Sequence, residues 1–179
     1  MNILTTERIL TAIQFAIRKH NGQTRKNKDG TPIPYIEHPV ETVRLLVKYG
    51  VTDEVALVAA VLHDTLEDTT TTVEELEDLF GSEVTAVVKE VTDDKTLGKN
   101  ERKEEQIRRA PKYSKAARNV KLADCTHNIF SILTHPPKWN EESIRGYIRV
   151  KRRLVDILAD SNQELANHFY EMAETVLRR

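Results

Sequence analysis

The chain has 179 residues, with 27 Lys and Arg against 28 Asp and Glu, 39% hydrophobic residues and a single Cys. This length suits one sizeable core and predicts a single domain over residues 1–179. The net charge of -1 argues against a general nucleic-acid-binding surface. One Cys closes no intramolecular disulfide, which favours a reducing, cytoplasmic setting. We also expect no membrane partner, because the sequence has neither a signal-peptide pattern nor a membrane-length apolar run.

Apolar residues recur with helical spacing along nearly the whole chain. In the first segment they fall at i, i+3, i+4, i+7 and i+8 from Ile9, which predicts a helix with one apolar face. The basic, glycine-containing stretch 21–34 breaks this pattern and predicts a long surface loop. Pro39 suits the first turn of a second helix that ends at Gly50, and Asp53 is placed to cap a third.

The third helix, predicted over about residues 54–65, is apolar around its whole circumference and is expected at the centre of the fold. Thr72 and Glu75 form a capping-box pattern for a short helix, and Ser82 is placed to cap the next one. A charged segment follows over residues 93–112. Further helices are predicted near residues 115–133, 141–158 and 163–177. Since no segment has the alternating pattern of a strand, the sequence predicts an all-α fold of about eight or more helices.

Two imidazoles and two carboxylates stand at the ends of apolar segments. His63 and Asp64 close the most apolar predicted helix, where an unpaired charge is costly. By itself this pair is equally consistent with a core histidine beside a helix-terminal aspartate. His38 lies at the start of the preceding helix, and Asp124 follows another apolar stretch. Together the four residues offer a mixed nitrogen and oxygen ligand set, which suits manganese, iron or zinc better than calcium.

Glu67 and Asp68 lie one helical turn beyond the His-Asp pair and can face the same pocket. The order of the four residues above resembles the H…HD…D order of the HD-domain metal-dependent phosphohydrolases. The segments GTPIPYIEHP, HDTLEDT, VTDDKT and KLADCTHN are also similar to signatures of the alarmone hydrolases. That family comprises the hydrolase half of the RelA/SpoT enzymes and the stand-alone small alarmone hydrolases, including the metazoan SpoT homologues. The resemblance covers residues 12–158, and helices near 141–177 complete the chain.

The resemblance implies an HD-domain helical bundle that binds Mn²⁺, or another divalent transition metal. The implied ligands are His38, His63, Asp64 and Asp124. Glu67 and Asp68 would flank the water that the metal activates, since a bound cation lowers the pKa of water from about 15.7 toward about 7. A neighbouring carboxylate orients that water or takes its proton. The implied reaction is that of the stringent response, in which the 3′-pyrophosphate is removed from (p)ppGpp to give GDP or GTP and pyrophosphate.

Basic residues occur in blocks along the chain, although a solvated helix face or loop is the favoured interpretation of any one block. The resemblance implies substrate contacts for five residues, which are Arg25, Lys26, Lys99, Asn128 and Tyr147. The first two correspond to a basic pair beside the guanine base and a nearby phosphate. Lys99 corresponds to a phosphate contact, Asn128 to a ribose contact, and Tyr147 to an aromatic residue near the pyrophosphate.

Two positions depart from the family pattern. Cys125 stands where a basic residue usually follows the Leu-Ala-Asp triplet, and Ser143 stands where stand-alone relatives have an Arg near the phosphates. Arg145 is a poor replacement for that Arg, because two residues along a helix correspond to a rotation of about 200°. The departures leave open an HD phosphohydrolase for another nucleotide, such as an adenosine alarmone, NADPH or a deoxynucleotide. A non-catalytic alarmone sensor is a further alternative, and the oligomeric state stays open.

Overall fold

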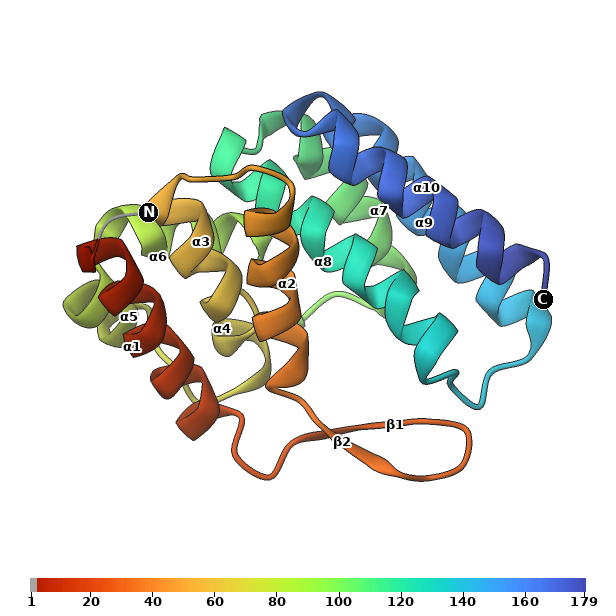
Figure 1. Cartoon of the computed structure of the whole chain (residues 1–179), viewed down its shortest axis with the longest axis horizontal. Coiled ribbons are helices and arrows are strands. Elements are labelled where there is room, and N and C mark those ends of the chain that lie inside the picture. Colours follow the sequence, from red (N-terminus) through yellow and green to blue (C-terminus); the bar gives the residue numbers. More distant parts are fainter. Residues whose placement is uncertain (1–2) are drawn as a thin grey trace.

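The computed structural model describes residues 3–179, except for the side chain of Lys26. It confirms the all-α class, because the regular structure of these residues is helical apart from one short hairpin (Figure 1). The helices are α1 (Ile3–Lys19), α2 (Glu37–Lys48), α3 (Glu54–Leu62), α4 (Thr65–Asp68), α5 (Val73–Phe80), α6 (Ser82–Val91), α7 (Lys99–Arg109), α8 (Lys115–Thr134), α9 (Glu141–Leu158) and α10 (Gln163–Leu177). Short 3₁₀ turns follow α7 and α9. Within the described residues, none of the helices combines the length and apolar character needed to cross a bilayer.

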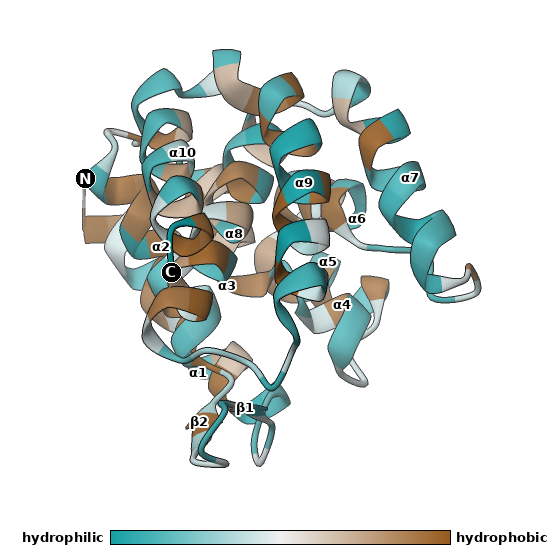
Figure 2. Cartoon of the chain, turned by 90° about the vertical axis from the view of Figure 1, so that its right-hand side faces the viewer, coloured by the Kyte–Doolittle hydropathy of each residue, from teal (hydrophilic) through white to brown (hydrophobic). Residues whose placement is uncertain are grey.

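The core is built around α3. Every side chain from Ala56 to Leu62 is 0% exposed, as expected for a helix that is apolar on all sides. Burying a single leucine such as Leu57 stabilises the fold by about 1.5–3 kcal/mol. α3 packs against α1, α2, α6 and α8, and α8 packs in turn against α9 and α10. Hydrophilic residues cover much of the outward side of α7 and α9 (Figure 2).

Two of the predicted helix caps are confirmed and a third is wrong. The Asp53 side chain accepts a hydrogen bond from the Val55 N–H at 3.1 Å, so it caps α3. Thr72 caps α5 in the same way. Ser82, however, is the first residue of α6, and the cap position belongs to Gly81 at φ +85°. A glycine takes this position because a positive φ is strained for residues with a Cβ.

The central helix ends earlier than predicted, and this places the polar residues that follow it. α3 stops at Leu62, and the chain turns before α4 begins at Thr65. The Thr65 hydroxyl donates to the Leu62 carbonyl at 2.7 Å, and the His63 ring contacts the Ala60 carbonyl at 2.8 Å. The side chains of Thr65 and His63 thus hydrogen-bond to carbonyls that would accept main-chain N–H groups if the helix continued. His63 and Asp64 therefore lie on a turn at the inner end of α3.

Two elements were not predicted. The stretch expected as a loop contains an antiparallel hairpin of β1 (Thr24–Lys26) and β2 (Pro32–Pro34), in which Arg25 pairs with Ile33. The hairpin extends below α2 in Figure 1. The charged segment contains α7, none of whose residues is buried. From α8 onward the predicted helix positions agree with the structure.

Candidate metal centre

Four side chains from separate parts of the chain converge between α2, α3 and α8. His38 is the second residue of α2, His63 and Asp64 follow α3, and Asp124 lies in the middle of α8. The two histidines are 1% and 2% exposed, and Asp124 is 5% exposed. The four candidate ligands of the H…HD…D pattern therefore meet in the interior.

The donor atoms of these residues face one point. The Nε2 atoms of His38 and His63 are 3.2 Å apart. Asp64 Oδ2 lies 3.4 Å from the His38 Nε2 and 3.1 Å from the His63 Nε2. Asp124 Oδ1 lies 3.3 Å and 4.0 Å from the same two atoms. Donor atoms of His38, His63 and Asp124 all lie within 4.8 Å of one another, as ligands of a single ion do, and Asp64 adjoins the two imidazoles.

The charges around the imidazoles suit a cation at this point. His63 Nδ1 lies 2.8 Å from the Ala60 carbonyl and donates to it, so Nε2 is the nitrogen that faces the centre. Burial lowers the pKa of His38 to about 4, so this ring is neutral near pH 7. Burial acts in the same direction on His63, but the Asp64 carboxylate outweighs it and raises the pKa of His63. The carboxylates therefore favour positive charge at the centre, which a protonated His63 or a bound metal cation supplies. The mixed donor set fits a divalent transition metal.

A further shell of side chains holds these donors in place. The Nδ1 atoms of His38 and His127 are 2.7 Å apart, so His127 orients the His38 ring. The Lys121 ammonium lies 3.2 Å from Asp124 Oδ2, with both side chains 7% exposed. Asn128 also donates to Asp124 Oδ1. Lys121 was not among the predicted site residues, because a helical lysine usually faces solvent.

Tyr35 connects the centre to α4. Its hydroxyl donates to Asp64 Oδ2 at 2.6 Å and lies 3.3 Å from Asp68 Oδ2. Burial, and then the nearby Asp64 carboxylate, raise the pKa of Tyr35, so the hydroxyl stays protonated and remains a donor. Sequence reasoning missed Tyr35, although it stands three residues before His38 in the quoted segment GTPIPYIEHP.

The two carboxylates of α4 diverge. Asp68 faces Tyr35 and also accepts from the Lys95 ammonium. Glu67 accepts from the Asp93 N–H at 3.2 Å. Burial, followed by the Asp93 carboxylate, raises the pKa of Glu67 above its ordinary value. Asp68 is thus joined to the centre through Tyr35, whereas Glu67 points toward α7.

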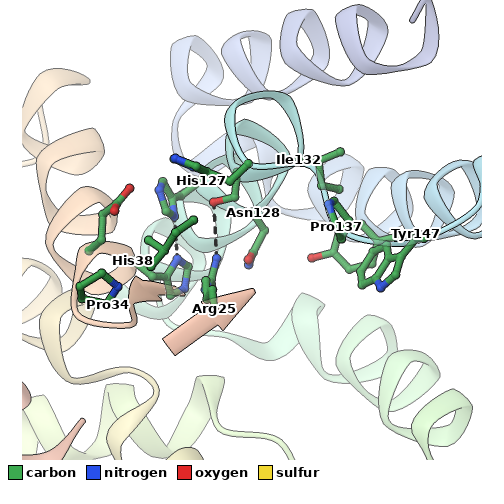
Figure 3. A pocket seen from close by; sticks show the side chains of 13 residues that line it. Arg25, Pro34, His38, His127, Asn128, Ile132, Pro137 and Tyr147 are labelled. Carbon is green, nitrogen blue, oxygen red and sulfur yellow. Dashed lines mark hydrogen bonds between the residues drawn. The ribbon is translucent and has the colours of Figure 1, made fainter. Parts of the chain in front are cut away.

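A cavity of about 230 Å³ opens beside His38, between the β1–β2 hairpin and the end of α8, and we call it the hairpin cavity. Figure 3 shows Arg25 and His38 on one side of it and Tyr147 on the other. The Arg25 guanidinium lies 5.2 Å from the centre of the Tyr35 ring and reaches Ser131 of α8. The wall combines apolar side chains with a few polar groups, as is usual for small-molecule sites.

A second pocket, of about 180 Å³, lies between α7 and α9, and we call it the basic pocket. Its charged wall residues are Lys99, Arg102, Lys103, Lys151 and Asp93. Tyr147 lines both the basic pocket and the hairpin cavity, so the two spaces are neighbours.

The structure distributes the predicted substrate residues over these two spaces. Arg25, Asn128 and Tyr147 line the hairpin cavity, and Lys99 lines the basic pocket. The side chain of Lys26 lies outside the described residues. Ser143 is exposed in the first turn of α9 and lines neither space.

Arg145 does not replace the Arg that stand-alone relatives have at position 143. It pairs with Glu141 at 2.7 Å and lines a separate groove near the C-terminus. Two residues along a helix correspond to a rotation of about 200°, so Arg145 faces a different side of α9 from position 143.

The family model described as HD domain matches residues 12–154, which is most of the chain. The chain belongs to the HD-domain family. This HD domain is 44% identical to the mouse protein named guanosine-3′,5′-bis(diphosphate) 3′-pyrophosphohydrolase MESH1 over 168 residues, which cover 93% of each chain. It is 45% identical to the human protein of the same name over 159 residues, or 88% of each chain. A solved structure described as a metazoan orthologue of SpoT that hydrolyses ppGpp superposes on the HD domain with a TM-score of 0.87, at 37% identity and 94% coverage of both chains.

Proposed function

We propose that this HD domain is a phosphohydrolase that removes the 3′-pyrophosphate from (p)ppGpp, giving GDP or GTP and pyrophosphate. The observation that carries the proposal is that the convergent donor atoms adjoin the hairpin cavity through His38, and that this cavity neighbours the basic pocket. A nucleotide with phosphates on both sides of its ribose needs such an arrangement, with room for the nucleoside and cations for the phosphates. The names of the mouse and human relatives support the same reaction.

We assign the metal to His38, His63, Asp64 and Asp124, and propose Mn²⁺ as the ion. When bound, a divalent metal of this kind activates the attacking water and stabilises negative charge on the phosphate. His127 and Lys121 fix the orientation of one imidazole and one carboxylate of this set. The ligands are thereby held in place before substrate arrives.

Glu67 and Asp68 are proposed to manage the proton of the attacking water. Glu67 accepts a hydrogen bond from the Asp93 N–H at Oε2, while Oε1 lies 4.0 Å from the Arg102 guanidinium and accepts no hydrogen bond from it, so Oε1 is the oxygen proposed to accept the proton. Its raised pKa makes it a better base near neutral pH than an ordinary glutamate. Asp68 is held by the Tyr35 hydroxyl and the Lys95 ammonium, so its proposed role is to orient the attacking water and not to accept the proton of that water.

The proposed substrate contacts are assigned from the residues that line the hairpin cavity and the basic pocket. Arg25 lines the hairpin cavity, where its planar guanidinium is placed to stack on a guanine base, and the Tyr35 ring lies 5.2 Å from that guanidinium. Asn128 lies at the boundary between that cavity and the metal centre and is assigned to the ribose. Lys99 and Tyr147 are assigned to phosphate groups in the basic pocket. Lys26 is proposed to assist Arg25, and residues 1–179 to act as one domain.

The test is incubation of the purified protein with Mn²⁺ and guanosine tetraphosphate, with GDP and pyrophosphate measured by chromatography. Glu67→Gln should lower kcat roughly 100- to 10,000-fold, the range for proton transfer by a positioned carboxylate. Glu77→Gln at an exposed position of α5 is the matched control and should leave kcat unchanged. Inactivity of protein with a fully loaded metal site would overturn the substrate assignment. Faster turnover of NADPH, a deoxynucleotide or an adenosine alarmone in the same assay would replace it.

A further inference from the structure

Lys151 is a half-buried cation that neither the sequence motifs nor the reaction above uses. It lies on α9 and lines the basic pocket. Its ammonium is 5.7 Å from the centre of the Tyr147 ring. It also contacts the thiol of Cys125 on α8, which is 0% exposed. Burial alone would lower the pKa of Lys151, but Cys125, Tyr147 and Asp124 raise it, so the side chain is charged at neutral pH.

The basic pocket has more positive charge than its own carboxylates neutralise. Its only acidic wall residue among the described part of the chain is Asp93, and the Gln106 amide donates to both oxygens of that carboxylate. Within the described residues, Lys99, Lys103 and Lys151 form no ion pair within 4.0 Å. The Nε of Arg102 is buried there without a hydrogen-bond partner among the same residues. Such a pocket attracts an anion.

The position of Lys151 next to Cys125 explains one departure from the family pattern. The resemblance to alarmone hydrolases implies a basic residue after the Leu-Ala-Asp triplet, and here α8 carries the neutral thiol of Cys125 at that position. The ammonium of Lys151 reaches this thiol from the neighbouring helix. A positive charge is therefore present beside Asp124 and Tyr147, although it comes from position 151 of α9 and not from position 125 of α8.

We propose that Lys151 binds a phosphate group of the substrate in the basic pocket, supplying from α9 a charge that a basic residue at position 125 of α8 would also place there. This inference rests on the proposed function for the identity of the nucleotide. Its chemical content is narrower, namely that a phosphate or pyrophosphate group contacts the Lys151 ammonium. Substrate specificity then depends on a pair of positions, 125 and 151, on two facing helices.

Steady-state kinetics with guanosine tetraphosphate test the role of the charge. Lys151→Met keeps the apolar stem and should raise KM roughly 10- to 100-fold, as expected for loss of one charge-assisted hydrogen bond, with kcat within about threefold. Lys151→Arg should keep KM within about threefold of the wild type. Arg149→Met removes a charge from the exposed side of the same helix and should change neither constant. A wild-type KM for Lys151→Met overturns the proposal.

Moving the charge back to α8 gives a second test. The double variant C125K/K151M should recover most of the KM that Lys151→Met loses, because it restores one ammonium to the same place. Failure of this rescue in a folded, metal-loaded protein overturns the proposed exchange between the two positions. If Lys151→Met does not fold, as judged by circular dichroism, Lys151→Gln takes its place with the same expected rise in KM.

Binding of inorganic pyrophosphate separates this inference from the proposed function. Calorimetry on the metal-loaded protein should show roughly 10- to 100-fold weaker binding to Lys151→Met than to wild type or to Arg149→Met. If the protein leaves guanosine tetraphosphate intact but binds pyrophosphate in this Lys151-dependent way, the proposed function fails and the phosphate site stands. If it hydrolyses the nucleotide and Lys151→Met binds pyrophosphate normally, the phosphate site fails and the function stands. Absence of pyrophosphate binding to wild type also overturns the site.

Discussion

Replacing Lys121 with Met removes the ammonium that neutralises Asp124 in the interior of the protein. The two groups are 3.2 Å apart and each side chain is 7% exposed. Met fills nearly the same space, so the main change is a buried carboxylate that loses its ion-pair partner while the Lys151 charge nearby remains. Breaking a buried pair in this way costs about 3–5 kcal/mol. For a chain of this length each kcal/mol lowers the melting temperature by roughly 2–4 °C, which gives an expected fall of roughly 6–20 °C.

Thermal unfolding followed by circular dichroism at pH 7 measures this fall, first with a chelator present. Lys115→Met, at the exposed start of α8, is the matched control and should melt like the wild type. Adding a divalent metal should narrow the difference between Lys121→Met and wild type, because the metal then neutralises Asp124. A Lys121→Met protein that melts within about 2 °C of wild type in chelator would refute the reasoning, since Asp124 would then need no cationic partner.

Three further predictions address the centre and the packing of α9 on α10. Tyr35→Phe removes the hydroxyl that donates to Asp64 and faces Asp68. The affinity of the variant for a divalent metal, measured by calorimetry, should fall roughly 10- to 100-fold. An unchanged metal affinity would contradict the proposal that Tyr35 positions Asp64. Divalent metal at about 100 times its dissociation constant should stabilise the chelated protein by about 2.7 kcal/mol, seen as a rise in melting temperature of roughly 5–10 °C, whereas no rise would count against the centre. Burial, and then the hydrogen bond from its hydroxyl to Asp156, raise the pKa of Tyr170 to about 12, above its value of about 10 in the unfolded chain. The contribution of the Tyr170 hydroxyl to stability is therefore present below about pH 10 and lost as the pH rises toward 12. In urea titrations, the difference in unfolding free energy between wild type and Tyr170→Phe should shrink over that pH interval. A constant difference would show that ionisation of Tyr170 is not coupled to unfolding.

The elements that the sequence predicted well have strong local signals. The apolar circumference of α3 and the caps Asp53 and Thr72 depend on neighbours in the chain, and the structure confirms them. The β1–β2 hairpin was missed because strands of three residues, one with a proline at each end, are too short to show alternation. α7 was missed because it buries no residue and so has no apolar face to detect.

The site residues that could be predicted are also those with a local signal in the sequence. The donor residues were found because histidines and carboxylates at the ends of apolar segments are unusual in sequence. Lys121 and Lys151 were not found, since lysines on helices are ordinarily solvated and only the packing of α8 against α9 brings them inside. Arg102 was missed for the same reason, as its contact with the wall of the basic pocket depends on where α7 lies.

A main-chain hydrogen bond holds the hairpin across the mouth of its cavity. The Lys28 N–H donates to the Pro136 carbonyl at 2.7 Å, which joins the hairpin turn to the connection between α8 and α9. These two segments supply opposite walls, with Ile33 on one side and Trp139 on the other. A bond between backbone groups survives substitution of almost any side chain. Evolution, or a designer, can therefore exchange the residues that face the base and alter which nucleoside is accepted while the entrance keeps its span.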